Sequence, residues 1–315
     1  MEEPSVILVG GPTASGKSSL AVQIAEQLDG VVINADAIQT YRDLNILTAR
    51  PSLLDEERVT HELYGFLDAT DTFSVGQWQK LALTEIASAT EKGKRSILVG
   101  GTGLYFKSLV EGIAAIPEIP SAIRASSREY FKQIGKQKFH AELLSRDPVM
   151  GQRISFGDSQ RMVRAWEVFE ATGQSLSYWQ GLPTEAPKLN FLMIVLMPPR
   201  EQVYLACEDR LDKMINEGVL SEVRKLTHRA NVEEIDPSSP IFKAIGYTEL
   251  SSHLEGKLSI EDALLAAKQK TRRYAKRQMT WFRNQFCGVE TSLAPNIRIL
   301  KYSCANHEKI FSNIS

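Results

Sequence analysis

Residues 10–19 read GGPTASGKSS and contain the spacing G-x-x-x-x-G-K-[ST], which is typical of a loop that binds phosphates. The residues that fit this spacing are Gly11, Gly16, Lys17 and Ser18. Glycines allow the tight turn, and backbone N–H groups then point at a phosphate together with the positive end of the following helix. We expect Lys17 to reach the outer phosphate and the Ser18 hydroxyl to suit Mg²⁺.

The flanks of this loop agree with that chemistry. The apolar residues 6–9 predict a buried strand before it, and Leu20, Ile24 and Leu28 recur at helical spacing after it. A Gly-rich turn without a ligand is the alternative, and it would require all four positions and both flanks to agree by chance. The loop predicts a diphosphate or triphosphate ligand, but it does not distinguish a kinase from an ATPase or a transferase.

A carboxylate stands one short step after the next apolar run. Asp36 follows residues 31–33, so it is expected on the same side of the sheet as the phosphate loop. An aspartate there can hold Mg²⁺ or act as a general base. It can equally cap a helix, and its position alone does not decide between these roles.

The third apolar run, residues 97–99, ends in GGTG at residues 100–103 and brings no carboxylate. An ATPase with this type of loop usually has an acidic metal partner on a neighbouring strand, so its absence counts against plain ATP hydrolysis. The GGTG stretch predicts either a second backbone site near the phosphates or a simple strand-to-helix turn.

Residues 268–283, KQKTRRYAKRQMTWFR, contain seven basic residues and no acid. Ala275, Met279 and Phe282 are spaced as the buried stripe of a helix. The side chains predicted to project elsewhere are Arg272, Arg273, Lys276 and Arg277. Such a basic stripe, with Tyr274 and Trp281 nearby, suits a nucleic-acid backbone, and a solvated helix face is an equal alternative.

A set of arginines outside that helix also stands out, namely Arg124, Arg161, Arg164 and Arg210. Each by itself is typical of a surface ion pair. As a set beside a phosphate loop they could instead clamp phosphates.

Apolar runs that alternate with helical patterns predict an α/β fold, a P-loop NTPase-like doubly wound parallel sheet with a helical insertion domain and a helical C-terminal part. The runs are residues 6–9, 31–33, 97–99 and 191–197. We expect residues 1–117 to form the first part of the core, 118–187 the insertion, 188–290 the rest of the core and the C-terminal helices, and 291–315 a tail. Within the insertion, Asp158 or Ser159 should begin a helix that Gly173 ends.

The composition excludes several classes of protein. The 315 residues carry a net charge of −1, so a nucleic-acid surface must be local. Cys207, Cys287 and Cys304 are far apart and predict neither a disulfide framework nor a zinc site. No signal-peptide pattern is present, and the apolar run at 191–197 is too short to span a membrane, so we expect a cytoplasmic protein without membrane contact. We also expect a monomer.

Several segments together resemble the tRNA dimethylallyltransferases, also called tRNA isopentenyltransferases. The segments are GPTASGKS, NADAIQTYRDLNILTARP, LVGGTGLYFKSL, DSQRMVRAWEVF, AIGYTEL and AKRQMTWFR. They occur in the order of that family and extend over residues 6–283. Ordinary P-loop kinases share only the first.

The resemblance implies transfer of a dimethylallyl group from dimethylallyl diphosphate to a tRNA, with release of diphosphate. The implied acceptor is the exocyclic N6 amine of the adenosine on the 3′ side of the anticodon, within the anticodon stem-loop. The opening loop would then hold an isoprenoid diphosphate and Mg²⁺ in place of ATP. This function accounts for the missing carboxylate on the third strand, because no water needs to be activated.

The resemblance also implies roles for single residues. Asp36 matches the catalytic base, Thr13 the loop threonine near the scissile bond, and Arg210 the arginine that binds the leaving diphosphate. The diphosphate loop comprises Gly11, Pro12, Thr13, Ala14, Ser15, Gly16, Lys17 and Ser18, with Ser18 as the metal ligand. The implied tRNA contacts are Asp36, Ala37, Ile38, Gln39, Thr102, Arg124, Gln160, Arg161, Met162, Val163, Arg164, Lys243, Ala244, Ile245, Gly246, Tyr247, Thr248, Lys276, Arg277, Gln278, Met279, Thr280, Trp281, Phe282 and Arg283.

Ala37 departs from the family pattern, in which serine follows the aspartate, so the role of that side chain at the adenine is in question. Three other functions compete with the transferase. A nucleotide or small-molecule kinase would leave the basic helix unexplained, and an adenylate isopentenyltransferase would not need a large tRNA surface. A non-catalytic RNA-binding protein would not need Lys17, Ser18 and Asp36 intact.

Overall fold

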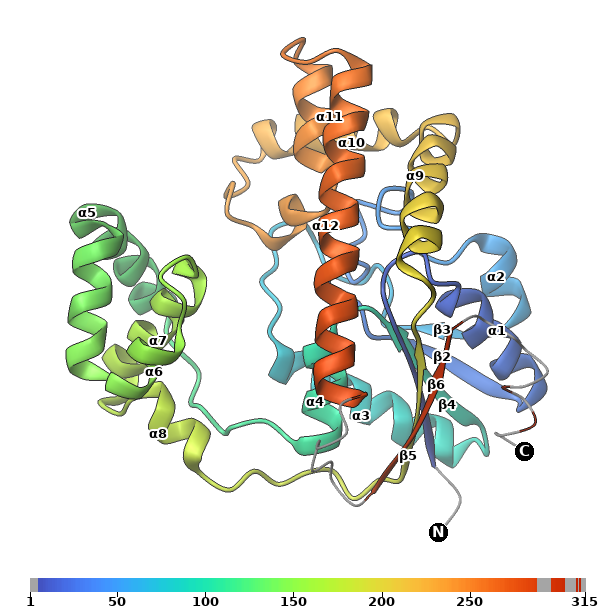
Figure 1. Cartoon of the computed structure of the whole chain (residues 1–315), viewed down its shortest axis with the longest axis horizontal. Helices are drawn as coiled ribbons and strands as arrows, with labels where there is room; N and C mark the ends of the chain where they lie inside the picture. The colour runs from blue at the N-terminus through green and yellow to red at the C-terminus, as the bar shows by residue number, and fades with distance from the viewer. Residues whose placement is uncertain (1–4, 288–295, 304–309, 311, 313–315) are drawn as a thin grey trace. The chain divides into compact units, whose positions relative to one another are not determined.

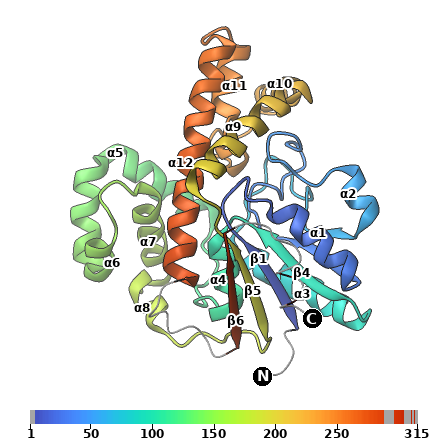
Figure 2. The same cartoon turned by 45° about the vertical axis from the view of Figure 1, so that its right-hand side comes forward.

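The computed structural model describes residues 5–287, 296–303, 310 and 312 (Figures 1 and 2). The chain divides into two compact units, Met1–Val110 with Pro187–Ser315, and Glu111–Ala186. The second unit overlaps the predicted insertion at 118–187 and begins earlier, at Glu111.

One parallel sheet of six strands lies in the described part of the first unit, in the order β3-β2-β4-β1-β5-β6. The strands are β1 (Val6–Gly10), β2 (Gly30–Asn34), β3 (His61–Glu62), β4 (Arg95–Gly100), β5 (Phe191–Leu196) and β6 (Ile297–Tyr302). β1 lies between β4 and β5, and β4 also pairs with β2. Because the strands are parallel, the loops that follow β1, β2 and β4 meet at one edge of the sheet.

Helices cover both faces of the sheet, which confirms the predicted doubly wound α/β fold. Successive side chains of a strand point to opposite faces of the sheet. In β1, Ile7 and Val9 pack with α1 (Lys17–Gln27), while Val6 and Leu8 pack with α3 (Val75–Glu91) and α4 (Gly103–Glu111). The long loop between β2 and α3 contains the short helix α2 (Leu53–Arg58).

The sequence analysis did not predict the two edge strands, β3 and β6. β3 has only two residues. β6 lies within residues 291–315, where no element was predicted, and it pairs with β5 at the edge of the sheet (Figure 2). Three of its six residues are partly buried, two are exposed and one is fully buried, so it lacks the continuous apolar run of a central strand. The tail residues 304–309, 311 and 313–315 lie outside the described part of the chain.

The helical C-terminal part contains α9 (Arg200–Asn216), α10 (Val219–Val232), the 3-10 turn η1 (Pro240–Lys243), α11 (Tyr247–Leu254) and α12 (Ile260–Phe286). These elements share a core with the loop after β2, in which Leu44 and Leu47 pack with Leu211 and Val223. The carboxyl-terminal turns of α12 instead join the sheet core through Phe282. In Figure 1 this long helix runs from the helical part to the sheet. α12 therefore connects two cores of the first unit.

The second unit consists of α5 (Ser121–Arg146), α6 (Pro148–Arg153), α7 (Ser159–Thr172) and α8 (Leu176–Gly181). α7 begins and ends as predicted, because the Asp158 side chain accepts from the N–H of Arg161 and Gly173 has a left-handed φ of 68°. Met162 and Trp166 are buried in the core of this unit.

Arg229 on α10 holds the long loop after β2 to the helical part. Its guanidinium donates to Asp43 at 2.6 Å and to both carboxylate oxygens of Asp68 at 2.8 Å, and it also bonds Glu233. Asp43 and Asp68 are 13% and 23% exposed, so both carboxylates depend on this partner. Arg229 on α10 therefore fixes the loop that carries Asp36 to the helical part.

We expect Arg229→Met to lower the free energy of unfolding by about 1–3 kcal/mol, between the values for exposed and buried ion pairs. Burial opposes ionisation of Asp68, but hydrogen bonds from Thr70 and Arg229 lower its pKa from 3.8 to about 2. This stabilisation is present above about pH 4 and is lost as the pH falls toward 2. Urea unfolding of both proteins at about pH 7 and about pH 3 should show a smaller difference at the acidic pH. If the wild type and Arg229→Met differ equally in free energy of unfolding at both pH values, the ion pairs of Arg229 do not depend on ionised Asp68.

Candidate active site

The loop after β1 has the geometry of an anion site. Gly16 has a left-handed φ of 83° and precedes α1, whose first turn has no side-chain cap. The N–H groups of this turn are therefore available to an anion, which the helix dipole also favours. Ala14 has a φ of 59°, a strained conformation for a residue with a side chain and one that is common at functional sites.

Two side chains of this loop are suited to a phosphate. The Lys17 ammonium donates to the Pro12 carbonyl at 3.2 Å. Burial lowers the pKa of Lys17 to about 8, with Asp36 opposing the shift and Arg210 adding to it. The buried Ser15 hydroxyl has no hydrogen-bond partner among the described residues. A bound phosphate would supply acceptors to both groups.

Asp36 is held by hydrogen bonds to its main chain and to one oxygen of its carboxylate. The buried Asn34 side chain accepts from the Asp36 N–H at 2.8 Å and donates to the Asp36 carbonyl at 2.9 Å. Asp36 Oδ1 accepts from the N–H of Ile38 at 3.0 Å, so the aspartate caps a turn and no helix follows it. Oδ1 therefore has a local structural function, and Oδ2 is the oxygen that can serve chemistry.

Arg210 brings a cation from α9 to the loop after β1. Its guanidinium donates to the Thr13 hydroxyl at 2.6 Å. Burial lowers the pKa of Arg210, with Cys207 and Asp36 opposing the shift, but an arginine stays charged. The three residues that the resemblance assigns to catalysis, Thr13, Asp36 and Arg210, line one cavity.

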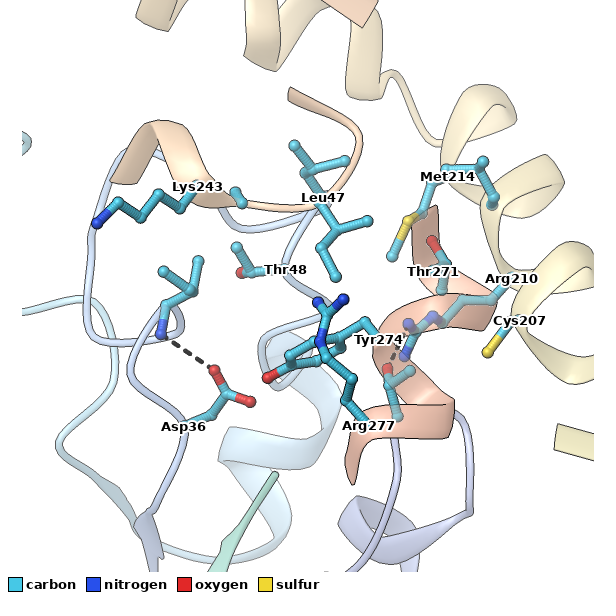
Figure 3. Close-up of a pocket in the computed structure, with 15 residues that line it drawn as sticks. Asp36, Leu47, Thr48, Cys207, Arg210, Met214, Lys243, Thr271, Tyr274 and Arg277 are labelled. Carbon is cyan, nitrogen blue, oxygen red and sulfur yellow. Dashed lines mark hydrogen bonds between the residues drawn. The ribbon is translucent and has the colours of Figure 1, made fainter. Parts of the chain in front are cut away.

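This cavity has a volume of about 290 Å³ and lies between the loops after β1 and β2 and the helices α9 and α12 (Figure 3). One part of its lining is apolar and consists of Ile38, Leu47, Leu211, Met214, Ala244 and Ile245. The polar part includes Thr13, Asp36, Arg210, Lys243, Tyr274 and Arg277. The arrangement suits a ligand with a charged group and a short hydrocarbon group.

Glu222 on α10 positions the apolar wall of this cavity. Its carboxylate accepts from three consecutive backbone N–H groups, those of Asn45, Ile46 and Leu47, at 2.5–2.9 Å. Gln39 adds two bonds from its side chain to the carbonyls of residues 48 and 49. The irregular loop is thus rigidly held where it faces the cavity.

The GGTG stretch forms the turn between β4 and α4 and lies against α12. A Cβ on Gly101 would collide with Gln278, and one on Gly103 would collide with Trp281. The glycines therefore allow a close approach of α12. The Thr102 hydroxyl accepts from the Ala37 N–H at 3.0 Å, a contact with the main chain that does not depend on the missing serine hydroxyl.

The basic segment of α12 divides into two halves. In the first half, Lys268, Lys270 and Arg272 pair with acids of α9 and α11, namely Asp212, Glu249 and Glu208. The exposed side chains Arg273, Lys276, Arg277 and Arg283 have no acidic partner among the described residues. Ala275, Met279 and Phe282 are buried as predicted. The first half is therefore a salt-bridged face, whereas the cations of the second half have no acidic partner in the described part of the chain.

The other residues that the resemblance assigns to tRNA lie in both units. Lys243, Ala244 and Ile245 line the cavity, Gly246 and Tyr247 begin α11, and Thr248 is exposed. Arg124 and residues 160–164 belong to the second unit, where Met162 is buried in the core and Arg161 is exposed. Gln278, Met279 and Phe282 are also buried, so the exposed side chains between 276 and 283 are Lys276, Arg277, Thr280 and Arg283.

The sequence analysis assigned no role to Leu47 or Met214 and named Tyr274 only beside the basic stripe, but all three line the cavity. Tyr274 and Gln278 lie four residues apart, so the helical period could have placed them on one face of α12. The neighbours of Leu47 and Met214 come from distant segments and leave no local signal. Cys207 and Cys287 are free thiols, and Cys304 lies outside the described residues.

The sequence matches known proteins over most of its length. The profile of the IPP transferase family matches residues 39–285. A tRNA dimethylallyltransferase of Rhodospirillum centenum is 46% identical over 286 residues, covering 90% of each chain. One of Phenylobacterium zucineum is 45% identical over 287 residues, covering 91% of this chain and 92% of the relative. The chain belongs to the tRNA dimethylallyltransferase family. This confirms the resemblance, and with it the assignment as an enzyme that transfers a prenyl group.

A solved member of this family has the same fold. The full-length tRNA isopentenylpyrophosphate transferase of Bacillus halodurans is 30% identical, with a TM-score of 0.67, covering 99% of this chain and 95% of that chain. A eukaryotic dimethylallyltransferase acting on tRNA is 24% identical with a TM-score of 0.81, covering 98% of this chain and 78% of that chain, and it supports the fold.

Proposed function

We propose that this enzyme transfers a dimethylallyl group from dimethylallyl diphosphate to the N6 amine of the tRNA adenosine on the 3′ side of the anticodon. The observation that carries the proposal is the cavity in which Thr13, Asp36 and Arg210 face a short apolar wall. A diphosphate fits the cationic end, and a five-carbon chain suits the lining of Leu47, Leu211 and Met214.

Asp36 is the base in this proposal. The adenine amine is a poor nucleophile because its lone pair is delocalised into the ring. As the amine attacks the allylic carbon, a new C–N bond forms and the proton passes to Asp36 Oδ2. The hydrogen bond from Ile38 to Oδ1 keeps the carboxylate in place during this transfer.

The leaving group departs toward the loop after β1. The C–O bond breaks, and its electron pair leaves with the diphosphate. The N–H groups of α1, Lys17 and Arg210 lie where this negative charge develops, so they stabilise the transition state more than the ground state. Thr13, a residue of the phosphate loop, accepts a hydrogen bond from Arg210 and so joins that guanidinium to the loop.

Mg²⁺ fits this site as an ion held mainly by the substrate. Among the described residues, no three His, Cys, Asp or Glu side chains form a cluster for a metal. Mg²⁺ commonly binds through substrate phosphates, waters and one or two protein oxygens, and Ser18 at the start of α1 offers one. When bound, the ion would neutralise charge on the diphosphate.

The proposed partners are an anticodon stem-loop and dimethylallyl diphosphate, and the proposed active form is a cytoplasmic monomer. No helix in the described part of the chain is both long and apolar enough to cross a lipid bilayer. The target adenine must leave its stack to enter the cavity, and an anticodon loop, which is already partly unpaired, lowers the cost.

A labelling experiment tests the function against its competitors. The enzyme is incubated with dimethylallyl diphosphate labelled in the isoprenoid, together with unmodified tRNA, AMP or ATP. We expect label in the tRNA, and nuclease digestion with mass spectrometry should place it on one adenosine. Label in AMP or ATP would indicate an adenylate isopentenyltransferase. A kinase would instead consume ATP and leave the isoprenoid unchanged.

The exposed basic half of α12 predicts a salt-dependent contact with tRNA. Lys276, Thr280 and Arg283 are spaced four and three apart and form one exposed face. If both cations bind phosphates, the double variant Lys276→Ala and Arg283→Ala should weaken tRNA binding and reduce the slope of log affinity against log salt by roughly two. The affinity for dimethylallyl diphosphate should not change.

Lys257→Ala is the matched control, because it removes an exposed lysine that pairs with Glu255 outside α12. This variant should keep the wild-type slope. An unchanged slope in the double variant, with an unchanged melting temperature, would refute the phosphate contacts and leave the transferase assignment intact.

A further inference from the structure

The buried side chain of Gln278 on α12 joins two loops at the edge of the sheet. Its Oε1 accepts from the backbone N–H of Thr13 at 2.8 Å, and its Nε2 donates to the carbonyl of Gly101 at 3.0 Å. The residue is 5% exposed, so both bonds are shielded from water. One amide thus fixes the phosphate loop to the turn after β4.

The same turn also holds the segment of the proposed base. The Thr102 hydroxyl accepts from the Ala37 N–H at 3.0 Å, and the Thr102 N–H donates to the Ala35 carbonyl at 3.2 Å. These bonds lie on either side of Asp36. The turn after β4 is therefore a common support, to which Thr102 attaches the base and Gln278 attaches the loop of the leaving group.

The helix that carries Gln278 also lines the cavity. Tyr274 and Arg277, one turn and one residue before it, are cavity residues (Figure 3). Trp281 on the same helix fills the space beside Gly103. A shift of Thr13 relative to this helix would also move its hydroxyl away from Arg210. The Gln278 amide therefore adds a direct link between the loop of the leaving group and the support of the base.

We propose that Gln278 is a positioning residue for the transfer reaction, which sets the position of Thr13, and through it Arg210, relative to Asp36. This inference rests on the proposed function. Because Gln278 is buried, it acts within the protein and does not contact RNA. Its contribution should appear in the rate of the chemical step and should not appear in tRNA affinity.

The test uses Gln278→Met, which keeps the approximate volume of the side chain and removes both hydrogen bonds. At saturating concentrations of both substrates, the single-turnover rate should fall by about tenfold to a hundredfold, as expected when reacting groups are displaced. The dissociation constant for tRNA should stay within about twofold of wild type. If this variant does not fold, Gln278→Asn serves in its place, because its shorter amide cannot bridge both partners.

Gln79→Met is the matched structural control. Gln79 is 9% exposed and its amide donates to the Ser108 carbonyl, so it also joins two elements of the same core, but it touches neither loop of the site. We expect this variant to lose thermal stability and keep the wild-type single-turnover rate.

A double-mutant cycle distinguishes a specific effect of Gln278 on Thr13 from a nonspecific loss of protein stability. Thr13→Val removes the hydroxyl that Gln278 is proposed to position. In that background, Gln278→Met should lower the rate by less than about threefold, because the two residues act together.

Equal losses in both backgrounds, or a wild-type rate in the single variant, would overturn the positioning role. The wild-type chain distinguishes this result from failure of the proposed function. If the wild type transfers no isoprenoid to tRNA, both the proposed function and the positioning role are wrong.

Discussion

Replacement of Asp36 by asparagine is expected to lower the single-turnover rate of dimethylallyl transfer by about 10²–10⁴-fold, the typical cost of losing a general base. Asparagine retains an oxygen that can accept from the Ile38 N–H, so the turn should persist. It has no carboxylate to accept the proton of the adenine amine. The rate is measured with labelled dimethylallyl diphosphate at saturating concentrations of both substrates.

Binding data and a second variant complete this experiment. The asparagine variant should bind tRNA with wild-type affinity, because the charge that is removed does not attract phosphate. Asp43→Asn is the control, since Asp43 lies in the same loop and pairs with Arg229 away from the cavity. That variant should lose stability and keep the rate of transfer. If Asp36→Asn retains most of the wild-type rate, another group is the base.

The second large effect is expected from Arg210→Met. Removing one preorganised donor to a developing negative charge typically costs about 10²–10³-fold in rate. Methionine fills much of the space of the arginine stem without its charge, so the variant should also bind dimethylallyl diphosphate and free diphosphate more weakly. Single-turnover rates and inhibition by diphosphate measure both effects.

A lysine at the same position tests whether geometry matters in addition to charge. Arg210→Lys keeps a cation, but its single ammonium cannot reproduce the planar fork that reaches Thr13 at 2.6 Å. We expect it to recover diphosphate binding in part and the rate less well. Arg272→Lys is the control, since Arg272 pairs with Glu208 on α9 and neither residue lines the cavity. Wild-type kinetics in Arg210→Met would remove Arg210 from the site.

The sequence by itself determined the features that depend on local spacing. The phosphate loop is recognisable because the tight turn needs glycine at fixed positions and the charged groups follow within one helical turn. The buried stripe of Ala275, Met279 and Phe282 follows in the same way from the helical period. The four central strands are evident because strands covered on both faces have continuous apolar runs.

Only the tertiary structure decided which partners these elements meet. The sequence segment 268–283 contains no acid, yet three of its cations are paired, because α9 and α11 bring acids from distant parts of the chain. Gln278 has no local signal of its own, since its partners Thr13 and Gly101 lie far from it in sequence. Such contacts depend on how separate elements pack, and the period of a single helix carries no information on what lies against each face.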